Sequence, residues 1–269
     1  MNALPSISGK TRLYAIVGDP IVQVRSPEVY CEQLAKAGID AVLVPVHIAA
    51  ADIHDVFPAL LKLRNLDGVL VTAPFKADAL AIADRVHPRA KRVGVVNALR
   101  RDADGSWFGD MFDGEGFVRG LLAHGHRVGG KRALLIGCGG AGSAIAGALM
   151  DAGVKEIALF DKDEARASTL ARLLAQESRH CDVHAGPASV VGKDLIINAS
   201  VVGMRDGDGM PVDIGPLDSS VIVGDVVLRP AESPTALIAH ARQYGCPVVS
   251  GVDMHSGQID AILEFFHIR

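Results

Sequence analysis

The sequence predicts an α/β fold made of two successive β–α series, and three observations support this prediction. Short apolar runs typical of buried strands alternate with amphipathic stretches typical of helices along most of the 269 residues. A glycine-rich turn joins a strand pattern to a helix pattern near the middle. The composition, with 49% hydrophobic and 22% charged residues, favours a buried core. Because parallel strands need crossover connections, the alternation predicts parallel sheets covered by helices.

The first series occupies the N-terminal part of the chain. Its strands are expected at residues 13–17, 41–46 and 68–71, and its helices at residues 27–37, 53–63 and 78–85. Ser26 directly precedes Pro27, and proline favours the first position of a helix. Ser26 is therefore the expected N-cap of the first helix.

A second series follows a connector at residues 127–131, where we place the hinge between two domains. Its strands are expected at residues 133–136, 156–160, 194–198 and 221–227, and its helices at residues 142–151 and 164–176. A helix at 113–124 separates the two series, and a helical pattern at 256–266 is expected to pack back on the first half. The predicted domains are residues 1–113 joined by 246–269, and residues 114–245.

Composition and charge exclude several classes of function. A net charge of -4 gives no bulk attraction to nucleic acid or to an anionic membrane, and 4% aromatic residues leave little for base stacking. The N-terminus lacks the order of a signal peptide, and no apolar run approaches the ~20 residues that span a bilayer. These features predict a cytoplasmic protein. The scattered cysteines have no zinc spacing, which predicts reduced thiols and no metal site; they are Cys31, Cys138, Cys181 and Cys246.

The glycine-rich turn is typical of a dinucleotide site. A strand at 133–136 runs into GxGxxG at Gly137, Gly139 and Gly142, with Gly140 and Ala141 between them, and a helix follows. The glycines allow a tight turn and a close approach of the backbone to a pyrophosphate, and the helix N-terminus offers free N–H groups to it. The alternative is a glycine-rich turn that binds no ligand.

An acidic residue ends the next strand, as ribose recognition requires. Asp161 follows the strand at 156–160, close to the usual ~20 residues from the glycines. Its carboxylate would accept hydrogen bonds from a ribose diol and repel a 2′-phosphate. Lys162 weakens this bias, and Asp163 and Glu164 restore it. The pattern favours NAD over NADP, the alternative for Asp161 being a solvated acid at a strand end.

Seven segments together resemble the shikimate dehydrogenase family, in the family's order and with the glycine turn between the fourth and fifth. They are residues 18–27 (family pattern GxPxxHSxSP), 71–76 (VTxPxK), 94–97 (GAVNT), 109–114 (GxNTDG), 198–204 (NATSxGM), 225–230 (DxxYxP) and 251–258 (GxxMLxxQ). The resemblance implies an N-terminal α/β substrate domain and a Rossmann-like dinucleotide-binding domain with a deep cleft between them. It also implies NAD(P)-dependent interconversion of a ring secondary alcohol and a ketone. The substrate would be shikimate, quinate or a related hydroxylated ring acid, and the protein a monomer or homodimer.

The resemblance also assigns candidate site residues. Alcohol oxidation sends a hydride to the cofactor and a proton to a protein base. Lys76 matches the family's catalytic lysine and Asp113 its partner aspartate; taken singly, both would read as surface charges. Four residues match the family's substrate contacts: Ser26, Thr72, Asn97 and Gln258. Asn198 and Gly251 match positions beside the cofactor.

Several residues depart from the family pattern on the substrate side. They are Gln23 and Val24 for His-Ser, Leu70 for asparagine, Ala98 for threonine, Met111 and Phe112 for Asn-Thr, Leu228 for tyrosine and His255 for leucine. A buried polar group left without a partner costs roughly 1–3 kcal/mol, enough to change specificity. The sequence therefore predicts weak or altered activity on shikimate, with Arg25 as an alternative donor to a carboxylate.

Two other functions remain open on the sequence alone. A non-catalytic nucleotide-binding regulator would keep the fold and lose turnover, and a SAM-dependent methyltransferase would also use a glycine-rich loop and an acidic strand end. The Lys76 and Asp113 pair favours the enzyme over the regulator, and the segments outside the cofactor domain disfavour the methyltransferase.

Overall fold

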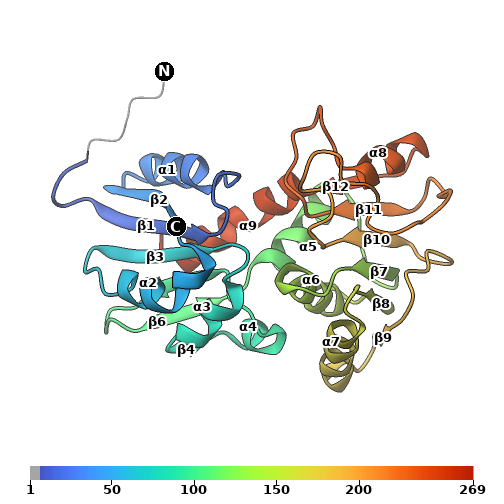
Figure 1. Ribbon diagram of the computed structural model, residues 1–269, viewed down its shortest axis with the longest axis horizontal. Coiled ribbons are helices and arrows are strands. Elements are labelled where there is room, and N and C mark those ends of the chain that lie inside the picture. The colour runs from blue at the N-terminus through green and yellow to red at the C-terminus, as the bar shows by residue number, and fades with distance from the viewer. Residues whose placement is uncertain (1–6, 269) are drawn as a thin grey trace. The chain divides into compact units, whose positions relative to one another are not determined.

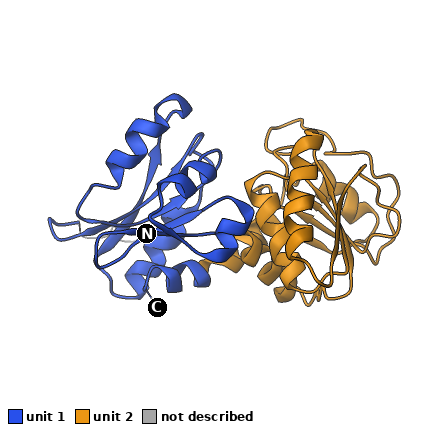
Figure 2. Cartoon of the chain, turned by 90° about the horizontal axis from the view of Figure 1, so that it is seen from below, with its two compact units in different colours: residues 1–112, 260–269 blue, residues 113–259 orange. Residues whose placement is uncertain are grey.

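The computed structural model describes residues 7–268, which divide into two compact units. Unit 1 comprises Met1–Phe112 and Asp260–Arg269, and unit 2 comprises Asp113–Ile259 (Figure 2). The sequence places the return of the chain at residue 246, whereas residues 246–259 belong to unit 2. The physical reason is that strand β12 (Val248–Ser250) pairs in parallel with β11 (Ile222–Asp225).

Unit 1 opens with the expected parallel strands and crossover helices (Figure 1). Its strands β1 (Arg12–Gly18), β2 (Ala41–His47) and β3 (Leu66–Val71) pair in parallel, with β1 in the middle. The crossover segments contain α1 (Ser26–Lys36), the short 3-10 helix η1 (Ala50–Asp52) and α2 (Ile53–Leu60), and α3 (Lys76–Ile82) follows β3.

The other half of this sheet corrects the expectation of an all-parallel arrangement. Beyond β3 the strand order continues with β5 (Ala98–Arg101), β6 (Trp107–Asp110) and β4 (Arg85–Val86), and α4 (Pro88–Val93) follows β4. Strand β5 runs antiparallel to both β3 and β6. A hairpin joins β5 to β6, and its turn holds Gly105 at φ 87. A hairpin needs no crossover helix, so alternation of apolar and amphipathic runs does not reveal it.

The N-terminus of α1 also differs from the prediction. Arg25 is the N-cap and makes no side-chain capping bond, and Ser26 is already the first helical residue. Pro27 does lie in the first turn, where its missing N–H is harmless. Because Ser26 does not cap the helix, its hydroxyl is not committed to that role.

Unit 2 is a doubly wound parallel sheet with strand order β12-β11-β10-β7-β8-β9. Its further strands are β7 (Arg132–Ile136), β8 (Glu156–Phe160), β9 (Asp182–Ala185) and β10 (Leu195–Asn198). Its helices are α5 (Asp113–Ala123), α6 (Gly140–Asp151), α7 (Glu164–Glu177), α8 (Ala236–Gln243) and most of α9 (Gly251–Phe265). The short elements β9, α8 and β12 were not predicted from the sequence.

The central strands of unit 2 are buried on both faces. Leu135 and Ile197 belong to the apolar cluster that includes α5, α6 and α7, whereas Leu134 and Ile196 point into a cluster on the opposite face. Strands enclosed in this way read as continuous apolar runs. This explains why the sequence identified β7 and β10 so clearly.

Glycines allow α5 to pack tightly against two neighbouring helices. A Cβ at Gly114 would overlap the carbonyl group of Ala144 in α6. A Cβ at Gly116 would lie 2.6 Å from the carbonyl oxygen of Met254 in α9. The separation of these helices is therefore set by backbone contact, which only glycine permits at these positions.

Replacing Gly116 with alanine tests this packing. The variant should lose about 1–3 kcal/mol of unfolding free energy, as overpacked cores do, even though alanine is the better helix former. Urea unfolding followed by circular dichroism measures the loss. Gly209→Ala is the control, because no atom lies within 4 Å of the added Cβ there. Equal stability of the two variants would contradict this account.

Candidate active site

In unit 1 the candidate substrate residues lie at one edge of the sheet. Strands β1, β3 and β6 end at this edge, and β5 begins there because it runs in the opposite direction. Thr72 follows β3 and Asn97 precedes β5. The backbone N–H of Thr72 donates to Val17 (2.9 Å), and the N–H of Val71 donates to the carbonyl of Asn97 (2.8 Å). The loops of this edge are thus hydrogen-bonded to one another.

Asn97 is buried, and its side chain has a defined orientation. Its Oδ1 accepts a hydrogen bond of 2.9 Å from the backbone N–H of Phe112. The sequence suggested that this amide would donate to and accept from a ligand at once. The contact with Phe112 uses one of the two lone pairs of this oxygen, so the dual role stays a prediction.

Lys76 and Ser26 lie at the starts of helices that follow two of these strands. Lys76 is the first residue of α3 and is half-buried. Its carbonyl accepts a hydrogen bond of 2.9 Å from the N–H of Val96, which ties it to the segment that leads to Asn97. Ser26 is buried at the start of α1. The sheet thus brings together, in unit 1, the segments that carry Ser26, Thr72, Lys76 and Asn97.

In unit 2 the glycine turn lies at the point where the strand order reverses. The chain runs from β7 outward through β8 and β9, and then returns to β10 on the other side of β7. Ligands of open parallel sheets bind outside the carboxyl ends of the strands at such a reversal. A Cβ at Gly137, where φ is 96, would lie 2.7 Å from the N of Ser200 after β10.

The glycine turn fits the pyrophosphate of a dinucleotide. A Cβ at Gly142 would overlap the carbonyl oxygen of Gly137, so this glycine permits the turn to close against α6. A Cβ at Gly139 would meet nothing within 4 Å, so the space in front of the helix is open. Gly139 is the N-cap of α6 and supplies no side chain, which leaves the N–H groups of Gly140 and Ala141 at the helix start without a side-chain cap.

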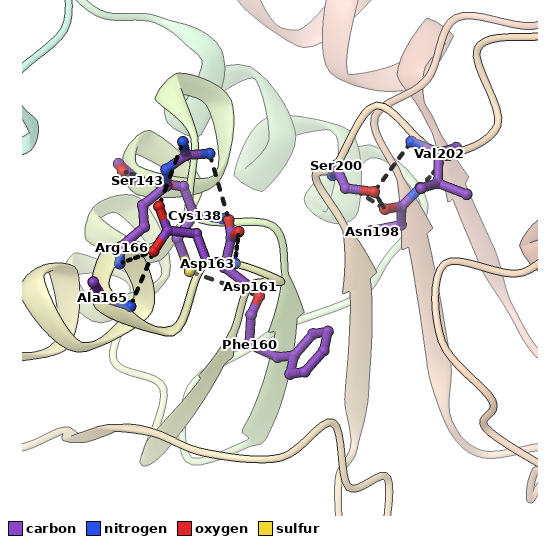
Figure 3. Close-up of polar contacts among 10 residues, drawn as sticks. All are labelled: Cys138, Ser143, Phe160, Asp161, Asp163, Ala165, Arg166, Asn198, Ser200 and Val202. Carbon is purple, nitrogen blue, oxygen red and sulfur yellow. Dashed lines mark hydrogen bonds and ion pairs between the residues drawn. The ribbon is translucent and has the colours of Figure 1, made fainter.

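Asp161 lies at the end of β8 and is linked to the glycine turn (Figure 3). Its Oδ2 accepts a hydrogen bond of 2.7 Å from the N–H of Cys138, and its Oδ1 accepts one of 2.9 Å from the N–H of Asp163. Arg166 approaches Asp161 to 3.9 Å. Burial, followed by the nearby charge of Asp161, raises the pKa of Cys138 to about 12, so this thiol stays neutral.

A buried network after β10 and β11 was not predicted. The Nδ2 of Asn198 donates to the carbonyl of Val202 (3.0 Å), and its Oδ1 accepts from the N–H and the hydroxyl of Ser200 (Figure 3). The Nδ2 also donates to Asp225 (3.1 Å). Thr235 donates to Asp225 at 2.6 Å. Burial raises the pKa of Asp225, and these hydrogen bonds oppose the rise. The Asn198 amide therefore shapes the loop rather than reaching outward.

The remaining candidates belong to unit 2. Asp113 is the buried first residue of α5, and it directly follows Phe112 in the chain. Gln258 is buried on α9, next to Gly116 of α5. Gly251 begins α9, and a Cβ there would lie 2.5 Å from the carbonyl oxygen of Val226. A side chain at Gly251 would thus separate α9 from the loop after β11.

Among residues 7–268, no three His, Cys, Asp or Glu side chains form a group that could hold a metal ion. None of the helices described there combines the length and apolarity needed to cross a bilayer. All four cysteines are free thiols.

Comparison with known proteins assigns the family. The model of the shikimate dehydrogenase substrate binding domain matches residues 16–99, and the ThiF family model matches residues 124–184. The shikimate dehydrogenase (NADP(+)) of Rhodospirillum rubrum is 35% identical over 94% of this chain and 91% of its own. The chain belongs to the shikimate dehydrogenase family. It is an NAD(P)-dependent oxidoreductase that acts on a CH–OH group.

Solved structures of similar proteins agree with the two-part shikimate dehydrogenase architecture. A shikimate 5-dehydrogenase from Listeria monocytogenes, in complex with shikimate and NAD, has a TM-score of 0.84 at 30% identity, covering 97% of this chain and 92% of its own. The 5-ketofructose reductase of Gluconobacter sp. strain CHM43 has a TM-score of 0.83 at 25% identity, covering 97% and 95%. Neither comparison supports the regulator or the methyltransferase.

The departures from the shikimate dehydrogenase pattern at the sheet edge of unit 1 are packed core residues. Leu70 and Ala98 are cross-strand partners on neighbouring strands, exposed by only 5% and 0%. Phe112 is also buried, and its ring contacts Phe265 with centroids 5.2 Å apart. Apolar packing has therefore replaced polar side chains at this edge.

The opening loop gives no sign of a substitute carboxylate ligand. The exposed Gln23 donates to the carbonyl of Pro20 at 2.9 Å, and Val24 offers no donor. The side chain of Arg25 is 67% exposed and faces Glu28 of its own helix at 3.7 Å. The hypothesis that Arg25 compensates for Val24 therefore gains no support from its position.

Replacing Gly139 with alanine tests the dinucleotide site. The added methyl group would fill the open space before α6 without touching the protein, so folding should be unaffected. The dissociation constant for NADH should rise about tenfold or more, because each charge-assisted hydrogen bond to a phosphate contributes about 1.5–3 kcal/mol. NADH fluorescence titration measures the change. Gly129→Ala, where the nearest atom is 3.8 Å away, is the control; unchanged affinity at Gly139→Ala would refute the assignment.

Proposed function

We propose that this enzyme interconverts the secondary alcohol and the ketone of a hydroxylated ring acid, shikimate, quinate or a close relative, with NAD as the preferred cofactor. One observation carries the proposal. The segments that bear Thr72, Lys76 and Asn97 are hydrogen-bonded together at one sheet edge, in a chain that belongs to the shikimate dehydrogenase family. The cytoplasmic location and the one or two subunits expected from the sequence stay predictions.

The reaction divides between the cofactor and the side chains of the proposed site. NAD(P), when bound, would supply the hydride acceptor for the carbinol carbon. Lys76 takes the proton of the hydroxyl during oxidation and returns it during reduction. Asp113 matches the family's partner aspartate, whose role would be to orient the lysine and the reacting hydroxyl. The Asn97 amide, oriented by the backbone N–H of Phe112, would hydrogen-bond to a ring hydroxyl.

The carboxylate end of the substrate would meet fewer donors than in the family pattern. Ser26 and Thr72 retain their hydroxyls, and Val24 lacks one. Gln258 is the donor that unit 2 would add. A lost partner for a carboxylate costs roughly 1–3 kcal/mol, which corresponds to about a tenfold change in specificity. A neighbour of the same fold is named a 5-ketofructose reductase, so a substrate without the shikimate ring is a reasonable alternative.

The NAD preference rests on Asp161. Its carboxylate is fixed at the end of β8 by the N–H groups of Cys138 and Asp163. A carboxylate fixed there would repel a 2′-phosphate and accept from a ribose diol. Similar relatives are named NADP(+) enzymes, so this residue is the point at which the chain would differ from them.

The variant Asp161→Asn tests the cofactor preference. Removing the charge leaves Arg166 nearby to attract a 2′-phosphate, so the ratio of kcat/KM for NAD to that for NADP should fall about tenfold, the equivalent of about 1.4 kcal/mol. Steady-state kinetics with both cofactors measures the ratio. Asp182→Asn, an exposed acid at the start of β9, is the matched control. A wild-type enzyme that prefers NADP would contradict the proposal.

The variant Lys76→Ala tests the acid–base assignment. Turnover should fall about 10²–10⁴-fold, the usual contribution of a general acid or base, while NADH binding persists. Initial rates and NADH titration measure the two effects. Lys62→Ala, an exposed lysine in the same unit, is the control. Turnover within twofold of wild type in Lys76→Ala would remove the lysine from the mechanism.

The same assay decides the substrate. Shikimate and quinate are compared with other cyclic hydroxy acids and with 5-ketofructose, each with both cofactors. Weak turnover of shikimate fits the apolar edge formed by Leu70, Ala98 and Phe112. Robust shikimate turnover with a micromolar KM would show that this edge does not alter the specificity.

A further inference from the structure

An ion pair in unit 1 holds the end of the strand that leads to Asp113. Asp110 ends β6, and its side chain is only 6% exposed. The Nε of Arg89 donates to its Oδ1 at 2.7 Å, and the Nη2 donates to its Oδ2 at 2.8 Å. A bidentate pair of this kind fixes both distance and orientation. Arg89 comes from α4, so the pair joins this short helix to the strand end.

The same carboxylate turns the chain after β6. Its Oδ1 also accepts a hydrogen bond of 2.7 Å from the backbone N–H of Met111. Asp110 is therefore held by Arg89 on one side, and it holds the next residue of the backbone on the other. A buried carboxylate that lost Arg89 would have to turn toward water, because an unpaired buried charge is costly. The Met111 N–H would then be released.

Arg89 also contacts Phe112 directly. Its guanidinium carbon lies 4.6 Å from the centroid of the Phe112 ring, and the Phe265 ring packs edge to face on Phe112 at 5.2 Å. A cation over an aromatic face contributes favourably, and a planar guanidinium can stack and bind a carboxylate at once. Arg89 thus fixes Phe112 as well as Asp110.

Phe112 connects this cluster to the proposed catalytic residues. Its backbone N–H donates to the Oδ1 of Asn97 at 2.9 Å, which sets the direction of the Asn97 amide. The residue after Phe112 is Asp113, the first residue of α5. A displaced Phe112 would therefore alter both the donor offered by Asn97 and the point at which Asp113 begins its helix.

We propose that Arg89 is a positioning residue for the reaction, acting through Asp110 and Phe112 on Asn97 and Asp113. The proposal rests on the proposed function, because that function gives Asn97 and Asp113 their roles. It also explains the replacement of the family's threonine by Phe112. The aromatic ring gives Arg89 a surface to stack on, and the backbone N–H of residue 112 still orients the asparagine.

The variant Arg89→Lys tests the proposal with the charge retained. Lysine cannot form both hydrogen bonds and stack as a plane, so the orientation of Phe112 should be lost. The KM and the dissociation constant for shikimate, or for quinate where quinate is turned over faster, should each rise about tenfold, and kcat should fall. The dissociation constant for NADH should stay within twofold. A purely structural role would lower the melting temperature and the active fraction but leave both substrate constants unchanged.

Arg85→Lys is the matched control, since Arg85 also pairs with an aspartate, Asp102, and lies over a phenylalanine ring, Phe108, in the same sheet. Its kinetic constants should stay within twofold of wild type.

A double-mutant cycle with Asn97→Ala tests whether Arg89 acts through Asn97. In the Asn97→Ala variant, Arg89→Lys should lower the substrate affinity less than threefold. A full tenfold loss of substrate affinity on adding Arg89→Lys to Asn97→Ala would show that Arg89 does not act through Asn97.

The outcomes separate this proposal from the proposed function. The positioning role would be overturned if Arg89→Lys kept its substrate affinity, KM and kcat within twofold of wild type. In that case, loss of turnover in Lys76→Ala would still support the proposed function. Lys76→Ala with full activity would instead remove the lysine from the mechanism, and a wild-type enzyme that turns over none of the cyclic hydroxy acids would remove the proposed function. The tenfold loss of substrate affinity in Arg89→Lys would still support the positioning role, because it is measured as binding.

Discussion

Parallel pairing of strands is the constraint on which the rest of this structure depends. Parallel strands require crossovers, and the crossovers place the carboxyl ends of the parallel strands at one edge of each sheet. In unit 2 this edge carries the glycine turn, Asp161 and Asn198. In unit 1 it carries Thr72, and the reversed strand β5 adds Asn97 at the same edge. Residues far apart in the sequence therefore gather without any long loop.

Close backbone contact is the second feature that links fold to function. Gly137 and Gly142 let the turn after β7 close against both α6 and the loop after β10. A similar close contact with backbone occurs at Gly116, where α5 packs against α9. Because the contacts are between backbone atoms, the geometry is rigid and tolerates no side chain. The dinucleotide site thus shares its physical basis with the core of unit 2.

The departures from the shikimate dehydrogenase pattern at the sheet edge of unit 1 have a common physical character. Leu70, Ala98 and Phe112 are buried, so apolar packing at the strand edge has taken the place of polar groups. Lys76 and Asp113, the residues proposed for proton transfer, match the family pattern. A site altered in this way would catalyse the same reaction on a less polar substrate. Arg89 becomes important in this setting, because it links the new aromatic ring to the retained asparagine.

Local patterns were sufficient for much of the fold. The apolar runs of β1, β7 and β10 and the glycine turn at 137–142 were identified because buried strands and tight turns leave strong local signals. The elements that were missed are short: β4, α4, β9 and β12 have few residues, and their stability comes from neighbours in the sheet. The hairpin of β5 and β6 was also missed, since strand direction is decided by pairing partners distant in the chain.

The sequence by itself determined the residue types of the site, the family to which the chain belongs and the place of the dinucleotide turn, because each depends on a short contiguous pattern. Only the tertiary structure decided how those residues are used. It showed that the oxygen of Asn97 serves the backbone, that the amide of Asn198 is directed inward to Asp225, and that Ser26 does not cap α1. Hydrogen-bond partners of this kind come from distant segments, and no local pattern specifies them.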